Sequence, residues 1–342
     1  MFRALLALFA LLMISVCAAA YWANYWWNVE TVSLSAPIDL EIKEGATIHG
    51  VSNDLFKKGL ITKDPKLFHW GWRIVLPKAT LKAGDYKFEG KLTPAKIAHI
   101  LASGQTITIS FTIPEGWNMY QIAEKLESVF PAKRKPDWLK LMTDKKLSDQ
   151  LPGKPSTVEG FLFPDTYTFN PKSAPIDVLS TMIQTFKKNF SDDLVAAGER
   201  LNLKPIEIVT LASIIEKETG KEEERPHISS VFHNRMRIGM RLQTDPTVIY
   251  GIWERYDGNI RRDDLKTPTP YNTYVIPGLP PGPIASPGRA ALKAAVEPIK
   301  TDDLYFVSRG DGSHIFSKNL RDHQKGVYQY QIQPARNRSV RN

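Results

Sequence analysis

Hydrophobic residues are densest at the amino terminus of the chain. Residues 4–20 carry no charge and are mostly Leu, Ala, Met, Ile, Val and Phe, and an aromatic group follows: Tyr21, Trp22, Tyr25, Trp26 and Trp27. An apolar run of this length that ends in aromatic rings can just cross a bilayer as a helix. The pattern predicts a membrane anchor over residues 1–27.

Charges beside this segment predict its orientation. Arg3 and the amino terminus precede it, whereas Glu30, Asp39 and Glu41 are the first charges after it. The positive-inside rule therefore predicts a single-pass protein of the inner (cytoplasmic) membrane, with its folded part outside the cytoplasm. A cleaved signal peptide is the alternative, because residues 18–20 are three alanines. Both interpretations predict export.

Short strand-like and helix-like segments follow one another between residues 38 and 104. Alternation of apolar and polar residues predicts strands at 39–42 and 84–88, and helical periodicity predicts helices at 48–58, 65–72 and 94–103. Small βαα modules of this kind pack two helices on a short sheet. We therefore expect a small domain at 38–104.

Helical patterns dominate the remainder. A strand is expected at 106–113, and helices are expected at 119–130, 137–147, 174–201, 205–219, 227–237 and 289–296. Strands at 304–307 and 314–316 flank a Gly-Asp-Gly turn, which predicts a hairpin. The mixture predicts an α+β fold, with a connecting region at 105–158 and a larger domain at 159–330.

Prolines and glycines crowd residues 267–288 too densely for a regular element. Apolar and aromatic side chains, among them Tyr271, Tyr274 and Leu279, occur between them. A long, stiff loop with such side chains is expected to form the wall of a site.

Composition restricts the chemistry. The chain has 342 residues, 42% apolar and 24% charged, which argues against disorder and for two or three domains. Its one cysteine, Cys17, lies in the apolar run, so thiol chemistry is excluded. His233 and His314 lack companions at metal-ligand spacing, and we expect no metal or other cofactor. The net charge of +9 suits nucleic acid, anionic lipid or an anionic wall polymer, and export argues against nucleic acid.

Two glutamates lie near the end of the helix expected at 205–219. On a helical wheel, Glu216 and Glu218 lie roughly 80° to either side of the apolar centre, so the wheel does not separate them. Glu218 has the more apolar neighbours and precedes the likely helix end at Gly220. Desolvation and the helix dipole would both hold its proton toward neutral pH, as a general acid requires. Solvated glutamates paired with lysines are the alternative.

Several long blocks then resemble one family, the MltG (YceG-like) endolytic murein transglycosylases. The blocks are 159–167, 211–219, 231–251, 271–274 and 278–284. The resemblance implies a membrane-bound enzyme that cuts peptidoglycan glycan strands internally, between MurNAc and GlcNAc, and leaves 1,6-anhydro-MurNAc ends. It also implies that residues 38–104 form a LysM-like module, and that the enzyme works at the membrane beside cell-wall synthases.

Site residues follow from the same match. Glu218 is the expected catalytic residue, acting first as general acid and then as base, with Glu216 as the runner-up. The expected substrate-facing residues carry amide, guanidinium, carboxylate or aromatic groups that suit sugars: Asn234, Arg235, Gln243, Asp245, Tyr271, Asn272 and Tyr274.

Two other functions stay open. A muramidase-type hydrolase would need a second carboxylate near Glu218, for which Asp245 is the best candidate. A non-catalytic peptidoglycan-binding protein would use the module at 38–104, with the larger domain as scaffold.

Overall fold

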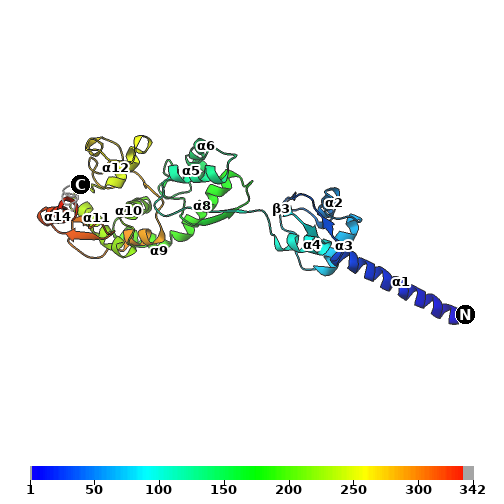
Figure 1. Ribbon diagram of the computed structural model, residues 1–342. Helices are drawn as coiled ribbons and strands as arrows, with labels where there is room; N and C mark the ends of the chain where they lie inside the picture. Colours follow the sequence, from blue (N-terminus) through cyan, green and yellow to red (C-terminus); the bar gives the residue numbers. More distant parts are fainter. Residues whose placement is uncertain (1, 334–342) are drawn as a thin grey trace. The chain divides into compact units, whose positions relative to one another are not determined.

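The computed structural model describes residues 2–333, so residue 1 of the expected anchor lies outside the described part. Its contacts divide the chain into two compact units (Figure 1). The first comprises Met1–Ile109 with Phe169–Pro171, and the second Ser110–Thr168 with Lys172–Asn342. Helices and short antiparallel strand pairs together make the expected α+β fold.

The first unit begins with the long helix α1, Phe2–Asn28. Its residues Leu5–Asn28 are long and apolar enough to cross a membrane. Only the end of α1 is buried, where Trp26 and Trp27 enter the core of the first unit. The ring of Trp27 lies 5.4 Å from that of Phe68, centroid to centroid. Helix α1 is therefore joined to the folded part by side-chain packing as well as by the chain.

A βααβ arrangement forms the rest of this unit. Strands β2 (Ile38–Ile42) and β3 (Gly84–Phe88) pair antiparallel, and helices α2 (Ile48–Lys57) and α3 (Pro65–Val75) lie between them in sequence. Helix α4 (Pro94–Ser103) follows, and the short strands β1 (Val32–Ser33) and β4 (Lys91–Leu92) form a second pair. The three helices all start at a side-chain cap that satisfies a free backbone N–H, from Thr47, Asp64 and Thr93 respectively.

The second unit begins with a strand pair and three helices. Strand β5 (Ile109–Thr112) pairs with β6 (Thr166–Phe169). The sequence predicted β5 but not β6. Between them lie α5 (Met119–Val129), α6 (Lys135–Met142) and α7 (Lys145–Ser148). Most of the region expected to connect two domains therefore packs within the second unit.

Helix α10 (Pro205–Glu218) is the centre of the second unit. Every residue from Ile208 to Ile215 is buried, and α9 (Asp192–Arg200), α11 (Arg225–Arg237), α12 (Asp245–Gly251) and α13 (Arg289–Val296) surround it. Helix α8 (Pro175–Asn189) precedes α9. The single helix expected at 174–201 is wrong, because the chain leaves the helical conformation at Phe190 and starts again after the N-cap Ser191.

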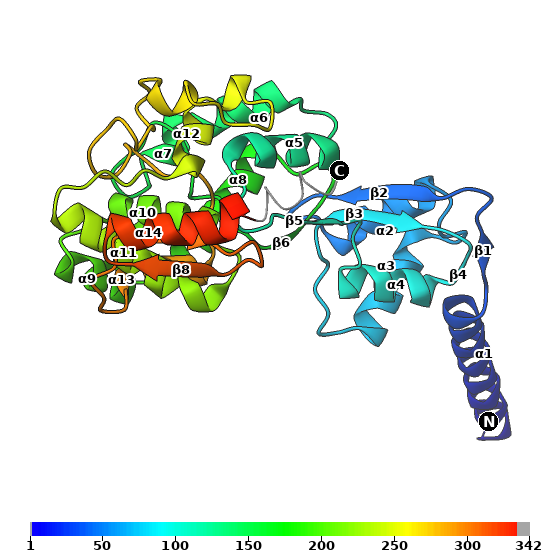
Figure 2. The ribbon, with the colours of Figure 1, turned by 60° about the vertical axis from the view of Figure 1, so that its left-hand side comes forward.

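The predicted hairpin near the carboxyl end is confirmed. Strands β7 (Tyr305–Ser308) and β8 (His314–Ser317) pair antiparallel, and α14 (Leu320–Val327) packs against them (Figure 2). Single turns of other helix types complete the unit: η1 (Glu222–Glu224), η2 (Trp253–Arg255), η3 (Asp264–Lys266) and η4 (Tyr328–Ile332).

Candidate active site

Glu218 is the last residue of α10 and opens on a cavity of about 690 Å³. The buried body of α10 fixes its backbone, while the end of the helix brings its side chain to the edge of the core. Four of the other expected residues line the same cavity: Arg235, Gln243, Asp245 and Tyr274. The structure thus brings together five residues from four separate segments of the chain.

Burial raises the pKa of Glu218 to about 7. The hydroxyl of Thr244 donates a hydrogen bond to Oε1 of Glu218, which favours the ionised form and lowers the pKa in part. The negative charge of Asp245 raises this pKa, and the positive charge of Arg235 lowers it. Near neutral pH, Glu218 therefore exists in both protonation states, which suits a group that must give and take a proton.

Arg235 is held by backbone carbonyls. Its Nε donates to the carbonyl of Leu304 at 2.7 Å and its Nη1 to that of Leu242 at 2.5 Å. The guanidinium also lies 5.4 Å from the centre of the Tyr305 ring. These contacts tie α11 to the start of the hairpin and place a fixed positive charge beside Glu218.

A buried group of threonines positions Thr244. Its backbone N–H donates to Oγ1 of Thr273 at 3.0 Å, and the hydroxyl of Thr247 donates to the carbonyl of Thr244 at 2.7 Å. Gln243, immediately before it, is exposed and has a positive φ of 50°. The strained backbone at Gln243 lets its side chain stay in the cavity while Thr244 turns into the core.

Tyr274 and Asp245 are joined across the cavity wall, where the hydroxyl of Tyr274 donates to Oδ1 of Asp245 at 2.7 Å. Burial raises the pKa of Tyr274, so the phenol keeps its proton. The loop residue Tyr274 and the first residue of α12 thus form one polar edge next to Glu218.

Glu216 has a different environment. Its Oε1 lies 2.7 Å from Nη2 of Arg225, and its Oε2 accepts from the backbone N–H of Gly288 at 3.0 Å. The side chains of Glu216 and Arg225 are 5% and 7% exposed. Glu216 does not line the cavity of Glu218. Its contacts make it a buried anchor between α10, α11 and the start of α13.

The remaining three expected residues lie elsewhere. Asn234 donates to the carbonyls of Thr301 and Asp303 at 2.9 and 3.0 Å. Asn272 is fully buried, and its amide donates to three carbonyls of the preceding loop. Both amides therefore hold loops in place, and their contact with substrate stays a prediction.

Tyr271 lines a neighbouring aromatic cavity of about 500 Å³. Its ring lies 4.7 Å from that of Tyr250, and Tyr120 stacks on Trp253 at 5.8 Å with 13° between the ring planes. The buried Glu159 contacts two residues that line this cavity: it accepts a hydrogen bond from the backbone N–H of Met119 at 2.9 Å and one from the hydroxyl of Tyr250. Burial raises the pKa of Glu159 to about 7.

The sequence did not identify several residues of the Glu218 cavity. Thr244 is one, and the others come from the hairpin and α14: Tyr305, Phe306, His314 and His323. Nδ1 of His314 lies 2.7 Å from Oε2 of Glu224, which ties the hairpin to η1. Among residues 2–333, no group of three His, Cys, Asp or Glu side chains is placed to hold a metal ion.

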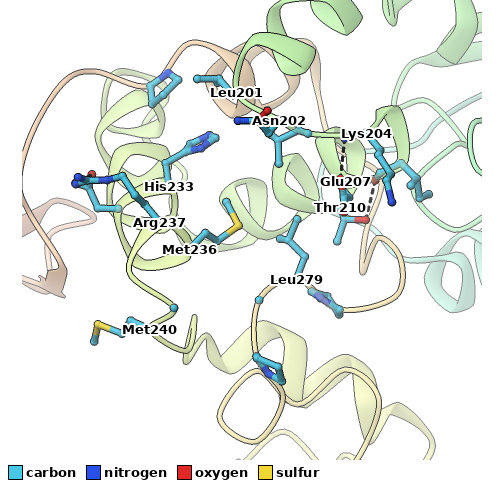
Figure 3. Close-up of a pocket in the computed structure, with 18 of the residues that line it drawn as sticks. Leu201, Asn202, Lys204, Glu207, Thr210, His233, Met236, Arg237, Met240 and Leu279 are labelled. Carbon is cyan, nitrogen blue, oxygen red and sulfur yellow. Dashed lines mark hydrogen bonds between the residues drawn. The ribbon is translucent and has the colours of Figure 1, made fainter.

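Another cavity, of about 910 Å³, does not contain Glu218 (Figure 3). It lies between the start of α10, the end of α11 and the proline-rich loop, with Met236 and Leu279 pointing into it. In this cavity the carboxylate of Glu207 accepts a hydrogen bond from the backbone N–H of Lys204 at 2.7 Å. The proline-rich loop was expected to form the wall of a site. Its 277–281 segment lines this cavity, and its Tyr274 lines the cavity of Glu218.

Known proteins give an independent view of the chain. An endolytic murein transglycosylase of Bacillus subtilis (strain 168) is 32% identical over 316 residues, which cover 86% of this chain and 84% of that protein. One of Streptococcus pneumoniae (strain D39) is 29% identical over 323 residues, and the match covers 58% of that longer protein. A crystal structure of a yceG-like protein from Listeria monocytogenes superposes with a TM-score of 0.59 at 32% identity, covering 85% of this chain and 99% of the other. The model of the YceG-like family matches residues 40–329, and the chain belongs to that family.

Proposed function

We propose that this protein is an endolytic murein transglycosylase that cuts the MurNAc–GlcNAc bonds of peptidoglycan and leaves 1,6-anhydro-MurNAc ends. The observation that carries the proposal is Glu218, a carboxyl group with a pKa raised to about 7 at the edge of an open cavity. The relatives that are named endolytic murein transglycosylases support the substrate class.

One carboxyl group is enough for this reaction. Protonated Glu218 gives its proton to the glycosidic oxygen, and the bond between that oxygen and C1 of MurNAc breaks. The carboxylate then takes the proton of the C6 hydroxyl of the same sugar, whose oxygen bonds to C1. Glu218 ends protonated, water is not consumed, and the products are a free GlcNAc hydroxyl and an anhydro ring.

The surroundings of Glu218 suit both steps. Burial holds enough of the carboxyl protonated to act as acid near pH 7. The Thr244 hydroxyl orients one oxygen of the carboxyl group, which leaves the other for the sugar. Arg235 lowers the cost of the carboxylate formed after the first proton transfer.

The same cavity offers groups for the sugar. Gln243 supplies an exposed amide, and the Tyr274–Asp245 pair supplies a fixed polar edge. Tyr271 would act from the aromatic cavity, where the rings of Tyr120 and Trp253 offer flat faces to a second sugar unit. Asp245 at the start of α12 lines the cavity of Glu218 and Tyr250 near its end lines the aromatic cavity, about 8 Å further along the helix axis.

A muramidase-type hydrolase is the second candidate, because Asp245 lines the cavity of Glu218 and its charge acts on that carboxyl. In that reaction Asp245 would activate water or attack the sugar, and the new ends would be reducing. The hydrogen bond that the Tyr274 hydroxyl donates to Asp245 favours a role for Asp245 in positioning the substrate instead.

The first unit fits this function as an anchor and a binding module. Helix α1 would hold the enzyme in the inner (cytoplasmic) membrane, with both folded units outside the cytoplasm and close to cell-wall synthases. The βααβ order of residues 38–88 supports a LysM-like module that binds peptidoglycan.

Substitution of the two glutamates tests the proposal. Glu218→Gln should abolish cleavage of purified peptidoglycan while binding is kept, and Glu216→Gln should still cleave when folded. An active Glu218→Gln variant would refute the proposed mechanism.

A further inference from the structure

Helix α3 exposes apolar side chains on its outer face. Trp70 and Ile74 are 58% and 75% exposed, whereas Phe68 and Trp72 on its inner face are buried. Large exposed apolar side chains gathered on one face often mark an interaction surface. We propose that this outer face of α3 lies in the headgroup layer of the membrane that α1 crosses. The inference rests on the proposed anchoring by α1.

Packing fixes α3 beside the end of α1 (Figure 1). Trp27, the next-to-last residue of α1, packs on Phe68, and it fills the space over Gly71. A Cβ atom at Gly71 would lie 2.3 Å from the Trp27 ring, so the two helices touch at this glycine. The outer face of α3 therefore lies next to the carboxyl-terminal end of the apolar helix α1.

The order of side chains around α3 matches that of an interfacial helix. At about 100° per residue, Ile74 lies about 60° from Gly71 and Trp70 about 100° from it. The exposed Lys66 and Arg73 follow, about 140° and 160° from Gly71. The apolar side chains of Ile74 and Trp70 thus lie on the part of the α3 surface next to α1. Lys66 and Arg73 lie on the same side of the helix, further from α1. Such helices bury their apolar face at the acyl boundary and place Lys and Arg among anionic headgroups.

Aromatic residues of α1 set the depth. Tyr21, Trp22 and Tyr25 are exposed near the same end of α1, where such rings lie at headgroup level. Trp70 and Ile74, packed beside that end, would lie at the same level. The module at 38–104 would then rest on the lipid surface in one orientation, instead of moving freely on a tether.

Fluorescent labels on the full chain in lipid vesicles test the inference. The native Cys17 provides one labelling site in α1, and a Cys17→Ser background provides Ile74→Cys and the control Glu41→Cys on the exposed side of β2. An environment-sensitive dye at each site is measured in phosphatidylcholine vesicles with phosphatidylglycerol. Lipids with a nitroxide on the upper acyl chain serve as quencher.

Quenching of the dye at positions 17 and 74, several-fold above that at 41, is the expected result. A dye at 74 that behaves like the one at 41, while 17 is quenched, would overturn the surface contact and leave the anchor intact. No quenching at 17 would overturn the anchor itself. A dye at 74 shielded from water but not quenched by lipid would mean that a second copy covers the face, which also overturns the inference.

The cations provide a second test. Lys66→Glu with Arg73→Glu should lower quenching at 74 several-fold in vesicles with phosphatidylglycerol, because the new charges repel anionic headgroups. The matched control is Lys87→Glu, on β3 away from α3, and it should leave quenching unchanged. Equal effects of both substitutions would contradict a role for this face.

Discussion

The hydroxyl of Thr244 donates a hydrogen bond to the carboxyl group of Glu218. This contact joins the residue before α12 to the last residue of α10, and it is the principal interaction that lowers the pKa of Glu218 against the effect of burial. Thr244 is itself buried and fixed by Thr273. The protonation of the proposed catalytic acid therefore depends on a residue whose own side chain does not ionise near neutral pH.

Removal of this hydroxyl should move the pH profile of cleavage. Activity of the native protein should fall as pH rises through about 7, because the acid form of Glu218 is lost. Thr244→Val removes a hydrogen bond that favours the ionised form, so the pKa rises. The alkaline limb should shift up by about one to two pH units, since hydrogen bonds to charged groups contribute about 1.5–3 kcal/mol.

Thr247→Val is the control for that shift. Its hydroxyl is also buried and bonded to Thr244 and Thr273, but it does not contact Glu218. This variant should lose stability without moving the alkaline limb. A limb that stays in place in Thr244→Val, or moves to lower pH, would refute the role given to Thr244.

Glu218 should also make stability depend on pH. Its pKa rises from 4.5 to about 7 on folding, so the folded state holds the proton more tightly and the free energy of unfolding falls as pH rises between those values. Glu218→Gln removes the ionisable group, so the free energy of unfolding of the variant does not fall in this way as pH rises. The variant should be more stable than the native protein at pH 8, by about 3 kcal/mol, with a smaller difference at pH 4.

Thermal or urea unfolding at several pH values measures that difference. Glu222→Gln, at an exposed carboxyl group near the same helix end, should leave the pH dependence as it is in the native protein. A Glu218→Gln variant whose gain in stability does not grow with pH would show that the carboxyl is not desolvated as described.

Glu216 should matter for stability more than for chemistry. Glu216→Gln leaves the buried Arg225 with one charged partner among the described residues, the half-exposed carboxylate of Glu115 at 3.4 Å. Breaking such a pair costs about 3 kcal/mol, so urea unfolding should shift to lower concentration while kcat of the folded protein stays near native. Glu115→Gln is the matched control and should cost under about 1 kcal/mol. Loss of kcat in a folded Glu216→Gln variant would contradict this assignment and indicate that Glu216, not Glu218, is the catalytic residue.

The aromatic cavity should contribute to binding of long strands. Trp253→Ala removes the ring that stacks on Tyr120, and KM for glycan strands should rise about tenfold, equivalent to about 1.4 kcal/mol, with kcat unchanged. Tyr256→Ala, at an aromatic residue that does not line this cavity, is the control. An unchanged KM in the folded Trp253→Ala variant would remove this cavity from the binding site.

Local sequence patterns predicted most elements of the fold, because caps and periodicity act over a few residues. Helix α4 follows the N-cap Thr93 and ends before Gly104, which has a left-handed backbone. Strand β6 was missed because its partner β5 lies more than fifty residues earlier, as the Thr112–Thr166 bond shows. The break between α8 and α9 was missed, although Ser191 followed by two aspartates is a helix-start signal.

The site was predictable only in part, for a similar reason. The wheel could not separate Glu216 from Glu218, since it describes one helix and not what packs against it. The contacts of Arg225 and Gly288 distinguish the two glutamates, because both bind the carboxylate of Glu216 whereas Glu218 lines the cavity. Tyr305 and His314 reach the cavity through the hairpin, and no spacing near Glu218 indicates them.

Analysis of the new glycan ends in heavy-oxygen water tests the central claim most directly. The full chain in lipid vesicles would digest purified peptidoglycan in this solvent, and the products would be analysed by mass spectrometry, with Glu218→Gln in parallel. The proposed mechanism predicts internal cuts with 1,6-anhydro-MurNAc ends that carry no heavy oxygen, and no new ends from Glu218→Gln. Reducing MurNAc ends that contain heavy oxygen would contradict it and identify a hydrolase.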